Sequence, residues 1–183
     1  GIYIFNYKEL RKYLIADAAD ENSKHDFGMN IIPSMLADKK KLYAWTFDGY
    51  WKDVGTVESL WQANMDLLDD KELDLYNIKK DWKIYSEDTL GKPQLIGAQA
   101  SVKNSLVTQG CVVNGEVEGS VLFSNVNVGE GAKVIDSVLM PGVLVEEGAV
   151  VKKAIIDEGV VIKAGTVVNE EAEEVALVSG NSR

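Results

Sequence analysis

The second half of the sequence repeats itself with a period of 17 residues, and this repeat constrains the fold more than any other feature. Residues 120–136 read SVLFSNVNVGEGAKVID, residues 137–153 read SVLMPGVLVEEGAVVKK, and residues 154–170 read AIIDEGVVIKAGTVVNE. A shorter unit of 15 residues begins at Ser105, and residues 96–102 match the second half of a unit. About four and a half units are therefore present, which is typical of a solenoid.

The spacing of apolar residues inside each unit predicts strands. Branched apolar residues return every five or six positions, which is too long for the 3.6-residue period of a helix and favours three short strands in each coil. At ~3.3 Å per residue such a coil closes into a triangle, and coils stacked ~4.8 Å apart pair every strand with the one below. Aligned residues such as Val126, Val143 and Val160 are predicted to form the core, and glycines such as Gly131 the corners. An antiparallel sandwich, the alternative, would not keep a fixed period.

The composition changes near residue 91, which predicts two domains, residues 1–90 and residues 91–183. All four tryptophans and all seven tyrosines lie before this point, whereas 12 of the 16 glycines lie at or after it. The sequence Gly91-Lys92-Pro93 at the change is typical of a domain boundary.

The first part of the chain mixes predicted helices and strands. Apolar residues at helical spacing predict a helix over about residues 7–18, capped by Asn6, and another helix that begins after Thr56. The apolar runs at residues 2–5 and 42–47 predict strands, the first of them buried. Because the chain opens inside a predicted strand, we expect it to be part of a longer polypeptide.

The charge balance excludes some classes of partner. The chain has 19 Lys and Arg against 29 Asp and Glu, a net charge of −10, which works against non-specific binding to nucleic acid or an anionic membrane. No stretch approaches the ~20 apolar residues of a membrane span. The single cysteine, Cys111, cannot form an internal disulfide, so we expect it to pack in a core and the protein to be cytoplasmic.

Three segments of the first part resemble one enzyme family. They are GIYIF at residues 1–5, HDFG with NIIP at residues 25–33, and GYWKDVGT at residues 49–56. Together they resemble the C-terminal half of glucose-1-phosphate adenylyltransferase, the bacterial ADP-glucose pyrophosphorylase. The repeat resembles the left-handed parallel β-helix of hexapeptide proteins, whose handedness comes from the resemblance alone. The resemblance thus implies an α/β remnant of a nucleotidyltransferase domain followed by an all-β left-handed β-helix.

The resemblance also implies an activity and a set of site residues. The activity is the transfer of an adenylyl group from ATP to glucose 1-phosphate, which gives ADP-glucose for glycogen synthesis and requires Mg²⁺. Asp53 matches the metal-binding, catalytic aspartate of the YWxDVGT motif. Tyr3, Asp26, Phe27 and Trp51 match positions that line the glucose 1-phosphate pocket. The alternatives are that Asp53 and Asp26 only cap helices and that Phe27 and Trp51 are plain core residues.

The sequence also departs from this family. Nothing in it resembles the glycine-rich loop GGGxGxRLxPLT that cradles the nucleotide phosphates, so we expect this chain to be inactive alone and the activity to belong to its parent. Another sugar nucleotidyltransferase and a non-catalytic regulatory or assembly subunit remain alternatives. A hexapeptide acyltransferase is disfavoured because residues 92–183 contain no histidine.

Two further expectations concern assembly and the single histidine. By the resemblance, the parent is an allosterically controlled tetramer, and we predict homo- or hetero-oligomers that form through the β-helix near Phe123 and the final coils. His25 is predicted to be structural, in support of Asp26, because a lone histidine is a poor candidate for a metal site.

Overall fold

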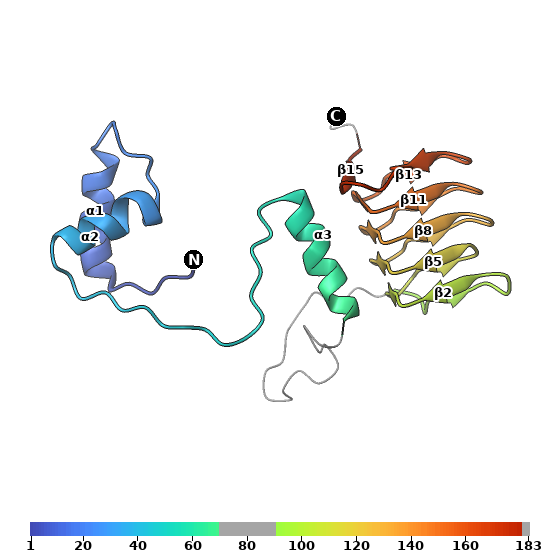
Figure 1. Ribbon diagram of the computed structural model, residues 1–183, viewed down its shortest axis with the longest axis horizontal. Helices are drawn as coiled ribbons and strands as arrows, with labels where there is room; N and C mark the ends of the chain where they lie inside the picture. The colour runs from blue at the N-terminus through green and yellow to red at the C-terminus, as the bar shows by residue number, and fades with distance from the viewer. Residues whose placement is uncertain (70–90, 181–183) are drawn as a thin grey trace. The chain divides into compact units, whose positions relative to one another are not determined.

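The computed structural model describes residues 1–69 and 91–180, which fall into two compact units (Figure 1). The first unit is Gly1–Gly49 and the second is Tyr50–Arg183. The domain boundary predicted at residue 91 lies beside residues 70–90, which are outside the described part of the chain, and it stays a prediction.

The first unit is helical. Helix α1 spans Tyr7–Ala18, a π-helical turn η1 spans Phe27–Ile31, and helix α2 spans Ile32–Ala37. The side chain of Asn6 caps α1 by accepting a hydrogen bond of 3.1 Å from the N–H of Lys8. The helix predicted at residues 7–18 is therefore confirmed, together with its cap.

The two strands predicted in this unit are wrong. Residues 2–5 and 42–47 form no strand, and the side chain of Ile4 is 98% exposed instead of buried. A strand is stabilised by hydrogen bonds to a neighbouring strand, and no residue described between 1 and 69 lies in one. An apolar run alone therefore does not make a strand in this unit.

The second unit begins with an irregular segment that leads into helix α3. This helix spans Val57–Met65 and continues as a 3₁₀ turn η2 over Asp66–Leu68. The N–H of Ser59 donates to Oγ1 of Thr56 at 3.1 Å, and the N–H of Thr56 donates to Oγ of Ser59 at 3.0 Å. These reciprocal bonds satisfy two donors at the start of the helix and confirm the helix predicted after Thr56.

The remainder of the second unit is a parallel β-solenoid built from very short strands. The strands are β1 (Leu95–Ile96), β2 (Ser101–Lys103), β3 (Leu106–Val107), β4 (Val112–Val113), β5 (Glu116–Glu118), β6 (Val121–Leu122), β7 (Asn127–Val128), β8 (Lys133–Ile135), β9 (Val138–Leu139), β10 (Leu144–Val145), β11 (Val150–Lys152), β12 (Ala154–Ile156), β13 (Val161–Ile162), β14 (Val167–Val168) and β15 (Ala176–Val178). They form three five-stranded sheets, ordered β1-β4-β7-β10-β13, β2-β5-β8-β11-β14 and β3-β6-β9-β12-β15. Each coil thus gives one strand to each sheet, and the coils stack as Figure 1 shows. This architecture confirms the predicted solenoid and is consistent with a left-handed β-helix.

The strand register follows the sequence repeat. Val138 pairs with Val121 below it and with Ile155 above it, so equivalent residues of successive units lie one over the other. The last coil is longer than the repeat predicts, because Ile155 pairs with Leu177.

Both faces of the third sheet, β3-β6-β9-β12-β15, are covered. Leu122, Leu139 and Ile156 point into the solenoid and are fully buried, and each such side chain contributes about 1.5–3 kcal/mol through burial. Their outward neighbours, such as Val138, are also buried, because α3 packs on this sheet. The indole Nε1–H of Trp61 on α3 donates to the carbonyl of Asp136 at 2.7 Å.

A ladder of serines links successive coils at the corner before the third sheet. Ser120 and Ser137 are fully buried. The N–H of Ser137 donates to Oγ of Ser120 at 3.0 Å, and the N–H of Ala154 donates to Oγ of Ser137 at 3.2 Å. Each hydroxyl donates in turn within its own coil, to the carbonyl of Glu118 at 2.8 Å or of Ile135 at 2.7 Å. The hydroxyls therefore satisfy buried backbone groups that the strands leave unpaired.

One corner of the solenoid requires glycine. Gly131, Gly148 and Gly165 occupy the same position in three coils, with φ of +65°, +66° and +68°. Only glycine adopts this left-handed conformation without a steric penalty. The predicted role of Gly131 as a corner residue is confirmed.

Cys111 packs in the solenoid core, as predicted. The residue is fully buried, and its Sγ lies 3.0 Å from the carbonyl oxygen of Phe123. Burial raises the pKa of this thiol above its ordinary value. None of the described helices has the length and apolar character needed to cross a membrane.

Candidate functional site

Aromatic rings gather in the first unit. The ring centroids of Tyr3 and Phe27 are 5.8 Å apart, and the ring of Phe5 lies 5.9 Å from the first and 5.6 Å from the second. These separations are typical of favourable aromatic pairs. Tyr3 is 46% exposed and Phe27 is half-buried, so the cluster is open to solvent. The structure brings two predicted pocket residues together and adds Phe5, which the sequence assigned to a strand.

Asp26 lies next to this cluster in the chain and has a clear local role. Its Oδ1 accepts a hydrogen bond of 2.7 Å from the N–H of Met29 and caps η1. The capping role that the sequence left open is therefore observed. The side chain is exposed, and its Oδ2 accepts no hydrogen bond from any described residue. One carboxylate oxygen thus remains for a ligand hydroxyl.

Asp17 of α1 organises the loop that precedes Asp26. The hydroxyl of Ser23 donates to Oδ1 of Asp17 at 2.5 Å, and Nδ1 of His25 lies 2.8 Å from Oδ2. These two contacts hold the pKa of Asp17 below its ordinary value. The prediction that His25 supports Asp26 is therefore wrong. The imidazole contacts Asp17 instead, because Asp26 uses its Oδ1 to cap η1.

Trp51 and Asp53 belong to the second unit and precede α3. Trp51 is 57% exposed, so it is not a core residue of this unit. Asp53 is exposed, and its Oδ1 accepts the N–H of Gly55 at 3.2 Å. Because Thr56 caps α3, Asp53 orders the turn before the helix and is not the cap. A pocket that combines these two residues with Tyr3, Asp26 and Phe27 stays a prediction.

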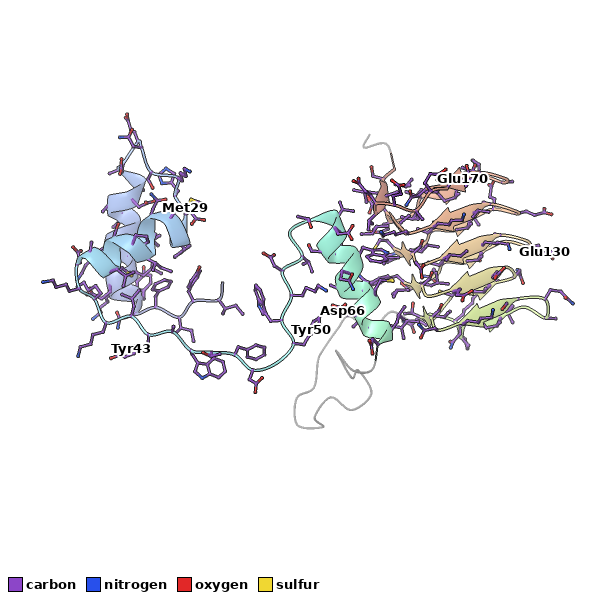
Figure 2. The ribbon with its side chains drawn as sticks, in the orientation of Figure 1. Met29, Tyr43, Tyr50, Asp66, Glu130 and Glu170 are labelled. Carbon is purple, nitrogen blue, oxygen red and sulfur yellow. The ribbon has the colours of Figure 1, made fainter. Side chains whose placement is uncertain are left out.

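Asp66 fastens the segment before α3 to the end of that helix, as the labelled residues in Figure 2 show. Its Oδ2 accepts from the hydroxyl of Tyr50 at 2.8 Å and from Nζ of Lys52 at 2.6 Å. Its Oδ1 accepts from Nε2 of Gln62 at 2.9 Å. Burial raises the pKa of Asp66, but these three hydrogen bonds outweigh it and leave the pKa below its ordinary value.

The sequence analysis did not find this cluster. Tyr50 and Lys52 stand in the same motif as Trp51 and Asp53, so their types could have drawn attention. No repeat or spacing indicates that Asp66, at the end of the following helix, is their common partner.

The donor type of Asp53 fits a magnesium ion. Mg²⁺ prefers carboxylate oxygens and is often held by one or two carboxylates together with substrate phosphates. Within the described ranges 1–69 and 91–180, no group of three or more His, Cys, Asp or Glu side chains could hold a metal ion. Asp53 is thus a suitable single ligand, and the remaining ligands would have to come from the substrate or from elsewhere.

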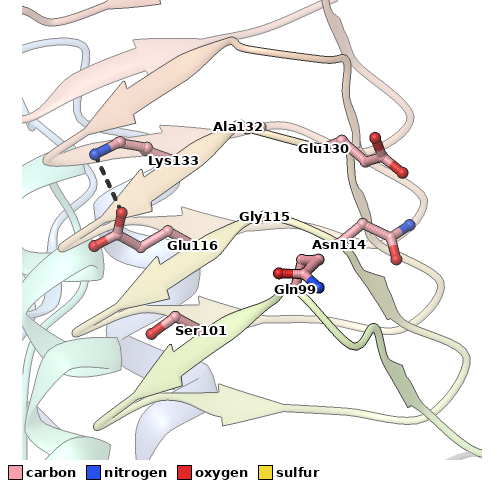
Figure 3. A pocket seen from close by; sticks show the side chains of 9 residues that line it. Gln99, Ser101, Asn114, Gly115, Glu116, Glu130, Ala132 and Lys133 are labelled. Carbon is pink, nitrogen blue, oxygen red and sulfur yellow. Dashed lines mark ion pairs between the residues drawn. The ribbon is translucent and has the colours of Figure 1, made fainter.

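A hollow of about 410 Å³ lies on the solenoid, away from the predicted residues (Figure 3). Polar side chains line it, among them Gln99, Asn114, Glu116 and Lys133. Nζ of Lys133 forms an ion pair of 3.2 Å with Oε2 of Glu116. No aromatic ring lines the hollow to support a sugar face. It is therefore not part of the candidate site.

Two family models match the chain, one on each part. Residues 1–70 match the family described as "Nucleotidyl transferase", and residues 94–177 match "GlmU-like, C-terminal hexapeptide". The chain therefore combines a nucleotidyltransferase region with a hexapeptide β-helix, as its sequence predicts.

Curated relatives narrow this class. The glucose-1-phosphate adenylyltransferase of Clostridium beijerinckii is 58% identical over 137 residues, which cover 74% of this chain and 35% of the relative. The enzyme of the same name from Clostridium novyi is 59% identical over 130 residues, 70% of this chain and 34% of the relative. The one from Fusobacterium nucleatum is 50% identical over 137 residues, with 74% and 35% covered. The chain is thus a homologue of glucose-1-phosphate adenylyltransferases, and it spans about a third of the length of these relatives.

Proposed function

We propose that this chain is part of a glucose-1-phosphate adenylyltransferase, a cytoplasmic enzyme that makes ADP-glucose for glycogen synthesis. The observation that supports this most strongly is the identity of 50–59% to enzymes of that name over 70–74% of the chain. The retained YWKDVGT segment favours this catalytic role over a non-catalytic subunit.

In the proposed reaction, a phosphate oxygen of glucose 1-phosphate attacks the α-phosphorus of ATP. A new P–O bond forms, the bond from the α-phosphorus to the oxygen that bridges to the β-phosphate breaks, and pyrophosphate leaves with that oxygen. The reaction needs no covalent enzyme intermediate. Catalysis of this kind depends on positioning the two phosphates and on balancing their negative charge.

The residues of the first unit would bind the sugar. The open faces of Tyr3 and Phe27 give an apolar surface for the ring, and the free Oδ2 of Asp26 accepts a hydrogen bond from a sugar hydroxyl. The cap on η1 fixes the carboxylate, because Oδ1 is held by Met29. The exposed indole of Trp51 would supply a second apolar surface.

Asp53 would hold Mg²⁺ through its carboxylate. When bound, the ion neutralises the negative charge that the reacting phosphates bring together. The bond between Oδ1 of Asp53 and the N–H of Gly55 restricts the rotation of the carboxylate, and the capped start of α3 follows directly. The carboxylate therefore projects from an ordered turn.

The proposal concerns a larger protein than residues 1–183, because these contain no glycine-rich nucleotide loop. We also propose that the protein self-associates through the β-helix near Phe123 and the final coils, with allosteric control as the resemblance implies. Outward apolar side chains in the final coils support this, since Leu144 is 36% and Val161 is 41% exposed.

The test is the replacement Asp53→Asn in the complete protein, assayed for ADP-glucose formation from ATP, glucose 1-phosphate and Mg²⁺. We expect at least a ~100-fold loss of kcat with an unchanged circular dichroism spectrum, because an amide is a poor ligand for Mg²⁺. Asp157→Asn is the matched control. Asp157 is also exposed and also accepts a backbone N–H, from Glu158 at 2.8 Å, but it lies on the solenoid.

Three outcomes would contradict the proposal. Full turnover by the Asp53→Asn variant would remove the metal assignment. A complete protein that forms no ADP-glucose would favour the non-catalytic subunit. A preference for UTP or dTTP over ATP would point to a related sugar nucleotidyltransferase.

A further inference from the structure

The exposure of side chains alternates along the segment before α3. Tyr50 and Lys52 are partly buried, whereas Trp51 and Asp53 are exposed. In an extended chain, successive side chains point to opposite sides. The segment therefore has one side fixed to the protein and one side open, and both candidate site residues lie on the open side.

A single carboxylate oxygen holds the fixed side. The hydroxyl of Tyr50 and Nζ of Lys52 both donate to Oδ2 of Asp66, at 2.8 and 2.6 Å. The side chain of Asp66 is only 11% exposed, and that of Lys52 is 28% exposed. Hydrogen bonds to a charged and shielded acceptor are stronger than those made in open solvent. Asp66 thus fixes the residue on each side of Trp51, and the second of these, Lys52, directly precedes Asp53.

Asp66 itself belongs to a firmly anchored element. Nε2 of Gln62, one turn earlier on α3, holds Oδ1 of Asp66 at 2.9 Å. The helix is joined to the solenoid by the bond from Trp61 to the carbonyl of Asp136, and Nζ of Lys153 lies 5.6 Å from the centre of the Trp61 ring. The acceptor oxygen is therefore supported by the packed solenoid.

We propose that Asp66 is a positioning residue that sets the orientation of Trp51 and Asp53 through Tyr50 and Lys52. It touches neither the substrate nor the metal. It restricts the backbone of residues 50–53, so that the indole and the carboxylate on the open side keep one arrangement. The catalytic part of this proposal rests on the function proposed above, whereas the ordering of the segment can be measured without it.

The first experiment measures amide hydrogen exchange of the 183-residue chain. We expect Asp66→Asn to speed exchange in the segment 50–55 by about tenfold or more, because hydrogen bonds to a buried charge are lost. Exchange in the solenoid strands should stay unchanged. Glu58→Gln is the matched control, since it removes one negative charge from the exposed first turn of the same helix.

A double-mutant cycle separates positioning from general damage. Lys52→Met alone should speed exchange in the segment, but it should add little in the Asp66→Asn background, because the shared hydrogen bond is already lost. Asp66→Glu keeps the charge and should restore part of the protection. Additive effects of Lys52→Met and Asp66→Asn would overturn the proposal.

The second experiment measures kinetics in the complete protein. Asp66→Asn should lower kcat/KM for glucose 1-phosphate by about 10- to 100-fold, since misplaced groups lose transition-state stabilisation. Lys52→Met should again add little to that loss. The melting temperature of the solenoid should not change.

The outcomes distinguish this inference from the proposed function. If the unmodified complete protein is inactive, the proposed function fails, while the exchange data still test the ordering by Asp66. If the protein is active but Asp66→Asn leaves both exchange in residues 50–55 and kcat/KM unchanged, the positioning role is refuted. Faster exchange with unchanged kcat/KM would also refute it, because the segment would then be ordered without any effect on the site.

Discussion

The serine ladder gives the sharpest test of how the solenoid is held together. Replacing Ser137 by Ala removes one hydroxyl from a fully buried position. The N–H of Ala154, which donates to that hydroxyl at 3.2 Å, then loses its acceptor. The carbonyl of Ile135 loses one bond but keeps another, from the N–H of Lys153 at 3.0 Å. The variant therefore leaves one buried donor without a partner.

The expected cost follows from this count. A buried polar group left unsatisfied costs about 1–3 kcal/mol, so the free energy of unfolding should fall by that amount. Urea unfolding followed by circular dichroism measures the change, and hydrogen exchange at Ala154 should become faster. Ser124→Ala is the matched control, because the hydroxyl of Ser124 forms no hydrogen bond with any residue in the described part of the chain.

The control should change the free energy of unfolding by less than about 0.5 kcal/mol. If Ser137→Ala is as stable as Ser124→Ala and the amide of Ala154 stays protected, the ladder does not stabilise the solenoid in the way described.

Two further predictions concern charge and assembly. Hydrogen bonds from Lys12 and Lys40 lower the pKa of Glu9 from 4.5 to about 2, so these contacts are fully present above pH 4.5 and are lost as the pH falls toward 2. An NMR titration of the Glu9 carboxyl carbon should have its midpoint near 2 and should move upward in Lys40→Met; a midpoint of 4.5 in the unmodified chain would contradict the ion pairs. In sedimentation, the chain should form oligomers that Phe123→Glu weakens, and a monomer at all concentrations would count against association through the β-helix.

The solenoid could be predicted from the sequence because its information is local and repeated. Each coil carries the same apolar and glycine positions, so Val121, Val138 and Ile155 align in the sequence and pair in the sheet. The helices could be predicted for a similar reason, since the caps at Asn6 and Thr56 lie next to the residues they serve.

The errors arise where structure depends on distant partners. The runs at residues 2–5 and 42–47 are apolar enough for strands, but a strand needs a neighbour that its own sequence does not specify. The site shows the same limit. Tyr3 and Phe27 meet as the resemblance implied, whereas the anchoring of Lys52 by Asp66 depends on where α3 ends.

The constant length of the coils affects how such a chain can change in size. Adding or removing 17 residues in phase would insert or delete one complete layer, and the side chains above and below would still meet equivalent neighbours. Adding a single residue would instead reverse the inward and outward faces of the strand that follows, because side chains alternate along a strand. The longer loop before β15 shows where extra residues fit, since they leave the chain before the strand resumes its place over β12. Insertions are thus accommodated at the corners, and the number of layers changes only in whole steps.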